Sequence, residues 1–342
     1  MDRIGDVFAL IPPESVRSIL TGCVHRLGRT KALPTPWRTR WGVVDGHEFF
    51  FPGESRHCPA CRERVIERGG KKVTLYYHVG VVFYLIADGF AAALDLEMLF
   101  PHEGELDAAL RLLERVFRNH GRMLDGVIGD AEYLCAPFFN MCTEHGKYAA
   151  AVLKNNNPAL LAEAKSLMAQ IEPTVQEGPA GRTFSWDIEG ISINDKMKKP
   201  VRVLRVFEPA RLPIRKRSKK QPEPEPHDNW WATTAPKPAL PTRDFTQLGH
   251  HRWDIENCVF NILVNQWGLD HCYKHDPAAI QNFILTLFIA YLLVQCFRSR
   301  NLKPELQRFF TTIIALADEL RASLAAATGR APWVERASLP PP

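Results

Sequence analysis

Asp45 is the first residue whose type and position could serve chemistry. It lies in the run RWGVVDGHEFFF (40–51), whose β-branched and aromatic residues predict a strand that stops at Pro52 and Gly53. Alternation along the strand places its carboxylate on a face otherwise made of packing residues. A carboxylate in apolar surroundings is costly unless a metal cation or a basic side chain neutralises it. Asp45 is therefore a candidate metal ligand, with a structural ion pair as the alternative.

Asp130 repeats this arrangement. It follows the strand-like run MLDGVIGD (123–130), at the carboxyl end of the predicted strand. Open α/β sheets usually place their functional sites at that end. Asp is also a good residue to cap the N-terminus of a following helix, so capping is the alternative.

The third acidic candidate is Glu256, in GHHRWDIENCVFNILVNQWGLDH, where we expect a helix over about 249–267. Arg252 and Glu256 are four residues apart and share one helical face. An exposed ion pair of that kind contributes only about 0.3–0.5 kcal/mol and is the simpler interpretation. However, His250, His251, Arg252 and Trp253 crowd the expected start of the helix, where a phosphate group would bind well.

Two carboxylates on adjacent strands and a third on a later helix can hold two divalent cations. Such ions activate water and stabilise the leaving oxygen of a phosphodiester. Mg²⁺ prefers oxygen ligands of this kind. Here 85 residues separate Asp45 from Asp130, and 126 separate Asp130 from Glu256.

The elements that must position these residues follow the order βββ-α-β-α-β. Three adjacent antiparallel strands followed by an α-linked fourth strand predict an RNase H-like α/β fold, a mixed sheet flanked by helices. A β-rich segment interrupts that fold before Glu256. We expect five regions: a short lead-in (1–40), the first part of the core (41–170), a β-rich insertion with a basic Pro-rich loop (171–243), a core completion carrying Glu256 and C-terminal helices (244–330), and a tail (331–342).

Taken together, these motifs resemble the DDE transposases of bacterial insertion sequences, in the branch with a β-strand insertion before the catalytic Glu. The resemblance rests on VVDGHEFF, SRHCPACRERV, VIGDAEYL and RWDIENCVFN with its downstream WGLDH, and it runs from about Trp41 to about His275. It implies that Asp45, Asp130 and Glu256 bind the metal ions, with Arg252 next to the active site. The chain departs from related enzymes at Gly249, where they carry a Tyr, and at Leu263, where they carry a Lys. It also has only 44 residues before Asp45.

The resemblance also implies an activity and partners. We expect a transposase that cuts and rejoins double-stranded DNA at the ends of a mobile element and at a target site, with Mg²⁺ or Mn²⁺, two ions in all, as a homodimer on paired ends. Two alternatives stay open. One is an RNase H-like nuclease without strand transfer, and the other is an inactive, transposase-derived DNA-binding protein.

Two further features could contact metal or DNA. Cys58 and Cys61 form CPAC, which is half of many zinc sites, and Cys135, Cys142 or a His could complete it. A basic run could track DNA phosphates, although such runs are more often simply solvated. With His251, Arg252 and Trp253, its members are the candidate DNA-binding residues: Arg215, Lys216, Arg217, Lys219 and Lys220. Trp230 and Trp231 could stack on bases, although packing is their commoner role.

Composition sets the wider limits. With 342 residues, 46% of them hydrophobic, the chain can bury a large core, which excludes a mostly disordered protein. A net charge of +5 permits a polyanionic partner without requiring one. Eight scattered Cys and an N-terminus unlike a secretory signal predict a cytoplasmic protein with free thiols, nucleoid-associated when bound to DNA. The apolar run 283–294 is too short to span a bilayer, and we expect a buried core helix and no membrane association.

Overall fold

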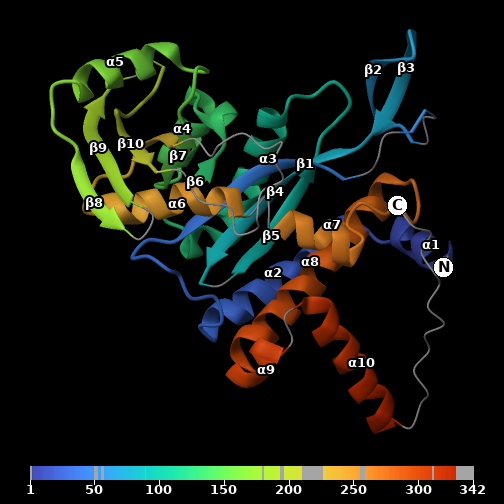
Figure 1. The fold of residues 1–342 in the computed structure, drawn as a ribbon. Helices are drawn as coiled ribbons and strands as arrows, with labels where there is room; N and C mark the ends of the chain where they lie inside the picture. Colours follow the sequence, from blue (N-terminus) through green and yellow to red (C-terminus); the bar gives the residue numbers. More distant parts are fainter. Residues whose placement is uncertain are drawn as a thin grey trace. The chain divides into compact units, whose positions relative to one another are not determined.

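A mixed β-sheet organises the N-terminal four-fifths of the chain (Figure 1). The structure, a computed structural model, describes residues 2–49, 53–54, 58–88, 90–178, 181–192, 196–209, 226–254, 259–309 and 312–328. Within these residues the sheet has nine strands in the order β5-β4-β1-β6-β7-β11-β10-β9-β8. Their bounds are β1 Trp41–Glu48, β4 Val79–Ala87, β5 Phe90–Met98, β6 Gly126–Gly129, β7 Tyr148–Val152, β8 Thr174–Gly178, β9 Gly181–Ile191, β10 Val201–Glu208 and β11 His227–Thr233.

The first five strands of the sheet have the RNase H-like arrangement that the sequence predicts. β4 is antiparallel to both β1 and β5, whereas β6 is parallel to β1 and β7 is parallel to β6. β4 is buried along almost its whole length and β6 along all of it, which explains their near-continuous apolar sequences. The expected mixed sheet flanked by helices is therefore confirmed.

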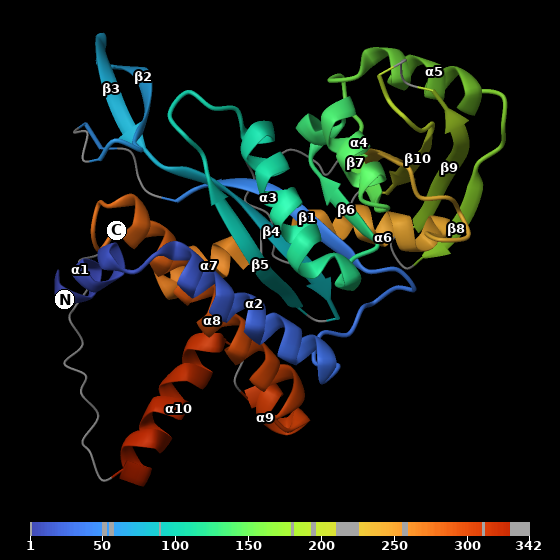
Figure 2. The ribbon, with the colours of Figure 1, turned by 180° about the vertical axis from the view of Figure 1, so that it is seen from behind.

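Helices cover both faces of this sheet. Figure 2 shows α3 crossing β4 and β5, with α4 and α5 on the same face, whereas α6 lies in front of the sheet in Figure 1. The helices have the bounds α1 Asp2–Leu10, α2 Pro13–Arg29, α3 Glu105–His120, α4 Ala136–Glu144, α5 Pro158–Met168, α6 Thr242–Asp254, α7 Asn261–Trp267, α8 Pro277–Arg300, α9 Pro304–Phe309 and α10 Ile313–Thr328, with short 3₁₀ turns η1 Gly121–Met123 and η2 Ala131–Tyr133.

A buried ion cluster joins two of these helices to the sheet. Asp95 of β5 is 1% exposed, and its carboxylate accepts hydrogen bonds from Arg17 Nε of α2 (2.7 Å) and Arg115 Nε of α3 (2.6 Å). The backbone N–H of Leu96 donates to the same carboxylate. The charge of Asp95 is thus fully paired, as burial of a carboxylate requires.

The β-rich segment extends the same sheet. β11 pairs with β7, and β10, β9 and β8 follow outward from it. A second buried ion pair holds this extension to α6: Arg202 of β10 donates two hydrogen bonds to the carboxylate of Asp187, and the hydroxyl of Thr242, the first residue of α6, donates to the same group. The basic run 211–220 lies outside the described residues.

Three local expectations need correction: one strand over 73–88, a helix over 249–267 and two further helices over 278–328. The run 73–88 forms two strands instead of one. Its first half belongs to a separate hairpin of β2 (Arg62–Arg68) and β3 (Lys71–Tyr77). The strand is interrupted at His78, and β4 then pairs with β1. The helix expected over 249–267 begins earlier, at Thr242, and the described part of α6 runs to Asp254. Three helices, instead of two, follow residue 276 among the described residues.

The chain divides into two units, 1–289 and 290–342. The second unit holds the C-terminal part of α8 together with α9 and α10. α8 is longer than the apolar run 283–294, and by length and composition alone it could cross a bilayer. Half of its apolar window is nevertheless buried within the protein, as in a core helix.

Candidate active site

Asp45 and Asp130 lie side by side on neighbouring parallel strands. The last paired residues of β1 and β6 are Val43 and Ile128. Asp45 comes two residues after Val43, and Asp130 comes two residues after Ile128. Because side chains alternate with a period of two, both carboxylates leave the same face of the sheet at the same level. Asp45 is 9% exposed, and Asp130 is half-buried. Two carboxylates therefore lie near each other at the carboxyl end of the parallel strands.

Asp130 also caps the turn that follows it. Its Oδ1 accepts a hydrogen bond of 2.8 Å from the backbone N–H of Glu132, at the start of η2. The capping role that the sequence offered as an alternative is thus present. It leaves ligand capacity, because an ionised carboxylate offers about four lone-pair sites.

The structure adds a third carboxylate that sequence reasoning missed. Glu105, the first residue of α3, lies directly against Gly46, where any Cβ would collide with its carboxylate. Its Oε1 accepts a hydrogen bond of 2.8 Å from the hydroxyl of Tyr133, which stands in the turn after Asp130. Gly46 follows Asp45 directly, so Glu105 lies beside both aspartate-bearing strands. The residue type gave no signal, since an acid in the first turn of a helix is ordinary.

The charges in this group influence one another. Burial raises the pKa of Glu105, and repulsion from Asp130 and Glu132 raises it further, against the hydrogen bond from Tyr133. Burial also raises the pKa of Tyr133 well above its usual range, and the negative charges of Glu105, Asp45 and Asp130 add to that effect. Three carboxylates thus lie within electrostatic reach of one hydroxyl. A divalent cation would relieve this repulsion, and the oxygen donors suit Mg²⁺ or Mn²⁺.

Glu256 lies outside the described residues, which resume at Val259. The ring of Phe260 stacks on His47, with centroids 4.1 Å apart and planes 9° apart. His47 follows Asp45 by two residues on β1. Burial lowers the pKa of His47 to about 4, so its ring is neutral at physiological pH. The chain four residues after Glu256 therefore contacts the strand that carries Asp45.

The expected phosphate site at a helix start is wrong. His250, His251, Arg252 and Trp253 lie more than two turns inside α6, because that helix begins at Thr242. Arg252 is 5% exposed, whereas Trp253 is 59% exposed. His251 is exposed, and its ring meets Trp37 edge to face.

A groove lies at the same end of the sheet, beside the last residues of β7. Its volume is about 530 Å³, and its lining includes Lys154 after β7, Trp231 of β11, and His250 and Trp253 of α6. Trp230 and Trp231 are 7% and 3% exposed, so packing is their main role. Trp253 presents the exposed indole of this groove.

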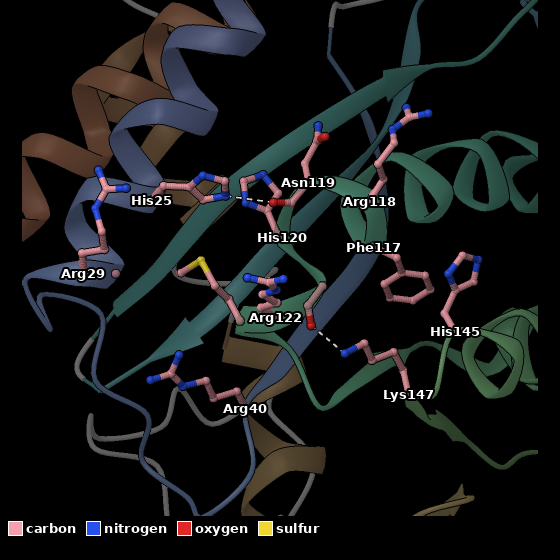
Figure 3. A pocket seen from close by; sticks show the side chains of 13 residues that line it. His25, Arg29, Arg40, Phe117, Arg118, Asn119, His120, Arg122, His145 and Lys147 are labelled. Carbon is pink, nitrogen blue, oxygen red and sulfur yellow. Dashed lines mark hydrogen bonds between the residues drawn. The ribbon is translucent and has the colours of Figure 1, made fainter.

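A larger hollow lies at the opposite end of the same strands (Figure 3). It has a volume of about 880 Å³, and its lining includes Arg40, which precedes β1, and Lys147, which precedes β7. Three further basic residues line it: Arg29, Arg118 and Arg122. None of the three carboxylates lines it. It is an electropositive surface separate from the candidate active site.

The cysteine pair is not completed by Cys135 or Cys142. Instead, His78 and His275 approach Cys58 and Cys61. His78 lies in the break between β3 and β4, and His275 lies just before α8. The sequence allowed an unspecified His as a further ligand, but it did not identify His78 or His275. The basic residues Arg215, Lys216, Arg217, Lys219 and Lys220 all lie outside the described residues.

Comparison with known proteins identifies the family. A family model described as "Transposase DDE domain" matches residues 94–293, a segment that contains Asp130, Arg252 and Glu256 but not Asp45. No curated protein sequence matches the chain. A similar solved structure is the NurA nuclease from Sulfolobus solfataricus, with 8% sequence identity and a TM-score of 0.27 over 59% of this chain and 69% of that one.

Proposed function

Because the chain belongs to the DDE transposase domain family, we propose that it cuts and rejoins double-stranded DNA at the ends of an insertion sequence, using divalent metal ions. The observation that supports this most directly is the parallel register of β1 and β6, which sets Asp45 beside Asp130. Glu256 is the third ligand in this proposal, and the contact of Phe260 with His47 brings its segment to β1.

Asp45, Asp130 and Glu256 would hold Mg²⁺ or Mn²⁺, two ions in all. When bound, the ions supply an activated water or 3′-hydroxyl and stabilise the leaving oxygen of the phosphodiester. The protein's own residues prepare this site. Tyr133 holds the carboxylate of Glu105 by a hydrogen bond, and the raised pKa of Tyr133 keeps its hydroxyl protonated for that purpose.

The neighbouring groove gives DNA a place to lie. Lys154 can pair with a phosphate, and the exposed indole of Trp253 can stack on an unpaired base. The groove and the carboxylates share one end of the sheet, so a strand lying in it would pass the metal ligands. A homodimer on two paired DNA ends is part of this proposal.

The test is DNA cleavage by the full chain with Mg²⁺, Mn²⁺ or EDTA, on duplexes that carry the ends of its own element. We expect metal-dependent cutting that Asp45→Asn, Asp130→Asn and Glu256→Gln each reduce at least about 100-fold, because each removes a metal ligand. Asp125→Asn is the matched control. Asp125 lies just before β6, at the end of the strand opposite to Asp130, and its carboxylate accepts a hydrogen bond from the backbone N–H of Arg40.

Three outcomes distinguish the alternatives. Cleavage with joined target products supports the transposase, whereas cleavage without joining indicates a nuclease. Binding to DNA with no cutting in any metal would overturn the proposed activity and indicate an inactive DNA-binding protein. Unchanged cleavage by the Asp45→Asn protein would remove Asp45 from the site.

A further inference from the structure

Four metal-ligating side chains converge in a place apart from the carboxylates. They are Cys58, Cys61, His78 and His275, and one ligand atom from each lies within 4.8 Å of all the others. We propose that this cluster is a structural zinc site, which binds one Zn²⁺ through two thiolates and two imidazole Nε2 atoms. The proposal is independent of whether the chain cuts DNA.

Five of the six spacings among the four atoms are close to those of a tetrahedron around zinc, and the sixth, between Cys58 and His275, is within 4.8 Å. Zinc lies about 2.3 Å from sulfur and about 2.0–2.1 Å from nitrogen, so tetrahedral edges measure about 3.8 Å (S to S), 3.5 Å (S to N) and 3.3 Å (N to N). Cys58 Sγ lies 3.6 Å from Cys61 Sγ, and both sulfurs lie 3.5 Å from His78 Nε2. His275 Nε2 lies 3.6 Å from Cys61 Sγ and 3.0 Å from His78 Nε2.

Neither a disulfide nor ordinary packing accounts for this arrangement. A disulfide requires sulfurs about 2.05 Å apart, so Cys58 and Cys61 are separate thiols. The two cysteines and His78 are at most 8% exposed, and all four ligand atoms lie within 4.8 Å of one another. Two sulfurs and two nitrogens in a closed tetrahedron select zinc over Mg²⁺ or Ca²⁺, which prefer oxygen, and leave no open position for catalysis.

The site would join three segments that are distant in sequence. Cys58 and Cys61 precede the β2–β3 hairpin, His78 precedes β4, and His275 lies 19 residues after Glu256. β4 pairs directly with β1, including Val82 opposite Asp45. Zinc would therefore tie the segment downstream of Glu256 to the strand beside Asp45. In this role it is a positioning element, with no contact to the reacting DNA.

The experiment measures metal in the full chain purified without added chelator. We expect about one zinc per chain by elemental analysis, which falls at least fivefold in Cys61→Ser and in His275→Ala. Cys272→Ser is the matched control, because Cys272 lies three residues before His275 but outside the cluster, and it should retain its zinc. Zinc removal should lower the melting temperature of the wild-type chain.

A second measurement does not depend on the folding of variants. Replacing zinc with Co²⁺ in the wild-type chain should give the intense visible bands of a tetrahedral site and a thiolate-to-cobalt band in the near ultraviolet. A chain that holds no zinc after growth with added zinc, and gives no such spectrum, would overturn the proposal. Loss of zinc in Cys272→Ser would overturn the assigned ligand set.

Discussion

Gly249 occupies a position where a larger side chain has no room. It lies on α6 directly against the indole of Trp231, which would overlap any Cβ placed there. The Tyr that the resemblance implies at this position therefore has no space here. Trp231 of β11 fills that space, and it also meets His250 edge to face at 5.5 Å.

This contact makes Gly249→Ala a sharp test. We expect it to lower the free energy of unfolding by about 1–3 kcal/mol, because a rigid indole must move out of a packed position. Urea unfolding of the full chain measures the effect. Gly22→Ala is the control: Gly22 lies within α2 with no atom within 4 Å of its added Cβ, so that change should be neutral or stabilise by up to about 1 kcal/mol. Equal effects of the two changes would contradict the role of Trp231.

Some site residues could be predicted from the sequence and others could not. The alternation around Asp45 and Asp130 predicts that each leaves a packed strand, and the structure sets them at one level through the register of β1 and β6. Glu105 gave no such signal, because its closeness to Gly46 depends on the packing of α3 across the sheet. His78 was equally hidden, since one histidine inside a strand-like run usually belongs to the core.

Buried ion pairs hold α2 and α3 to the sheet. Asp95 joins α2, α3 and β5 through Arg17 and Arg115, and all three side chains are mostly buried. Removing one partner from such a cluster leaves the others buried and unpaired. We expect Asp95→Ala to cost about 3–5 kcal/mol in the free energy of unfolding, measured by urea denaturation.

The matched comparison is an exposed ion pair. Glu177 and Arg182 join β8 and β9 with both side chains largely exposed, so Glu177→Ala should cost less than about 1 kcal/mol. If Asp95→Ala were as mild as Glu177→Ala, the two helices would be held by apolar packing alone.

The boundaries of elements were the least predictable feature. The apolar pattern after Gly249 predicted a helix start there, but the structure begins α6 at Thr242, where the hydroxyl joins the buried pair of Arg202 and Asp187. That pair depends on β10, which enters the sheet from a distant part of the sequence. The order of strands was predictable from short patterns, whereas this helix start depends on a tertiary contact.

For the whole molecule, charge is arranged at both ends of the central parallel strands. Carboxylates gather at one end, and the basic hollow of Figure 3 lies at the other. We expect the double variant Arg118→Gln and Arg122→Gln to weaken DNA binding, because both exposed side chains line that hollow. The slope of log affinity against log salt concentration should fall by about 0.9 for each phosphate that the variant no longer neutralises.

Arg182→Gln is the control for a general reduction of positive charge, since Arg182 is exposed and pairs with Glu177. Fluorescence anisotropy with labelled duplex DNA at several salt concentrations measures both variants. An unchanged slope in the double variant would mean that DNA does not bind in this hollow.

The order of strands also has a consequence for synthesis of the chain. β1 and β6 meet across 85 residues between Asp45 and Asp130, and His78 meets His275 across 197 residues. At about 5–20 residues per second, a ribosome needs tens of seconds to supply all these partners. A nascent chain therefore carries Asp45 long before it carries Glu256. Under the proposed function, we expect DNA cleavage to begin only after the segment with Glu256 has been made.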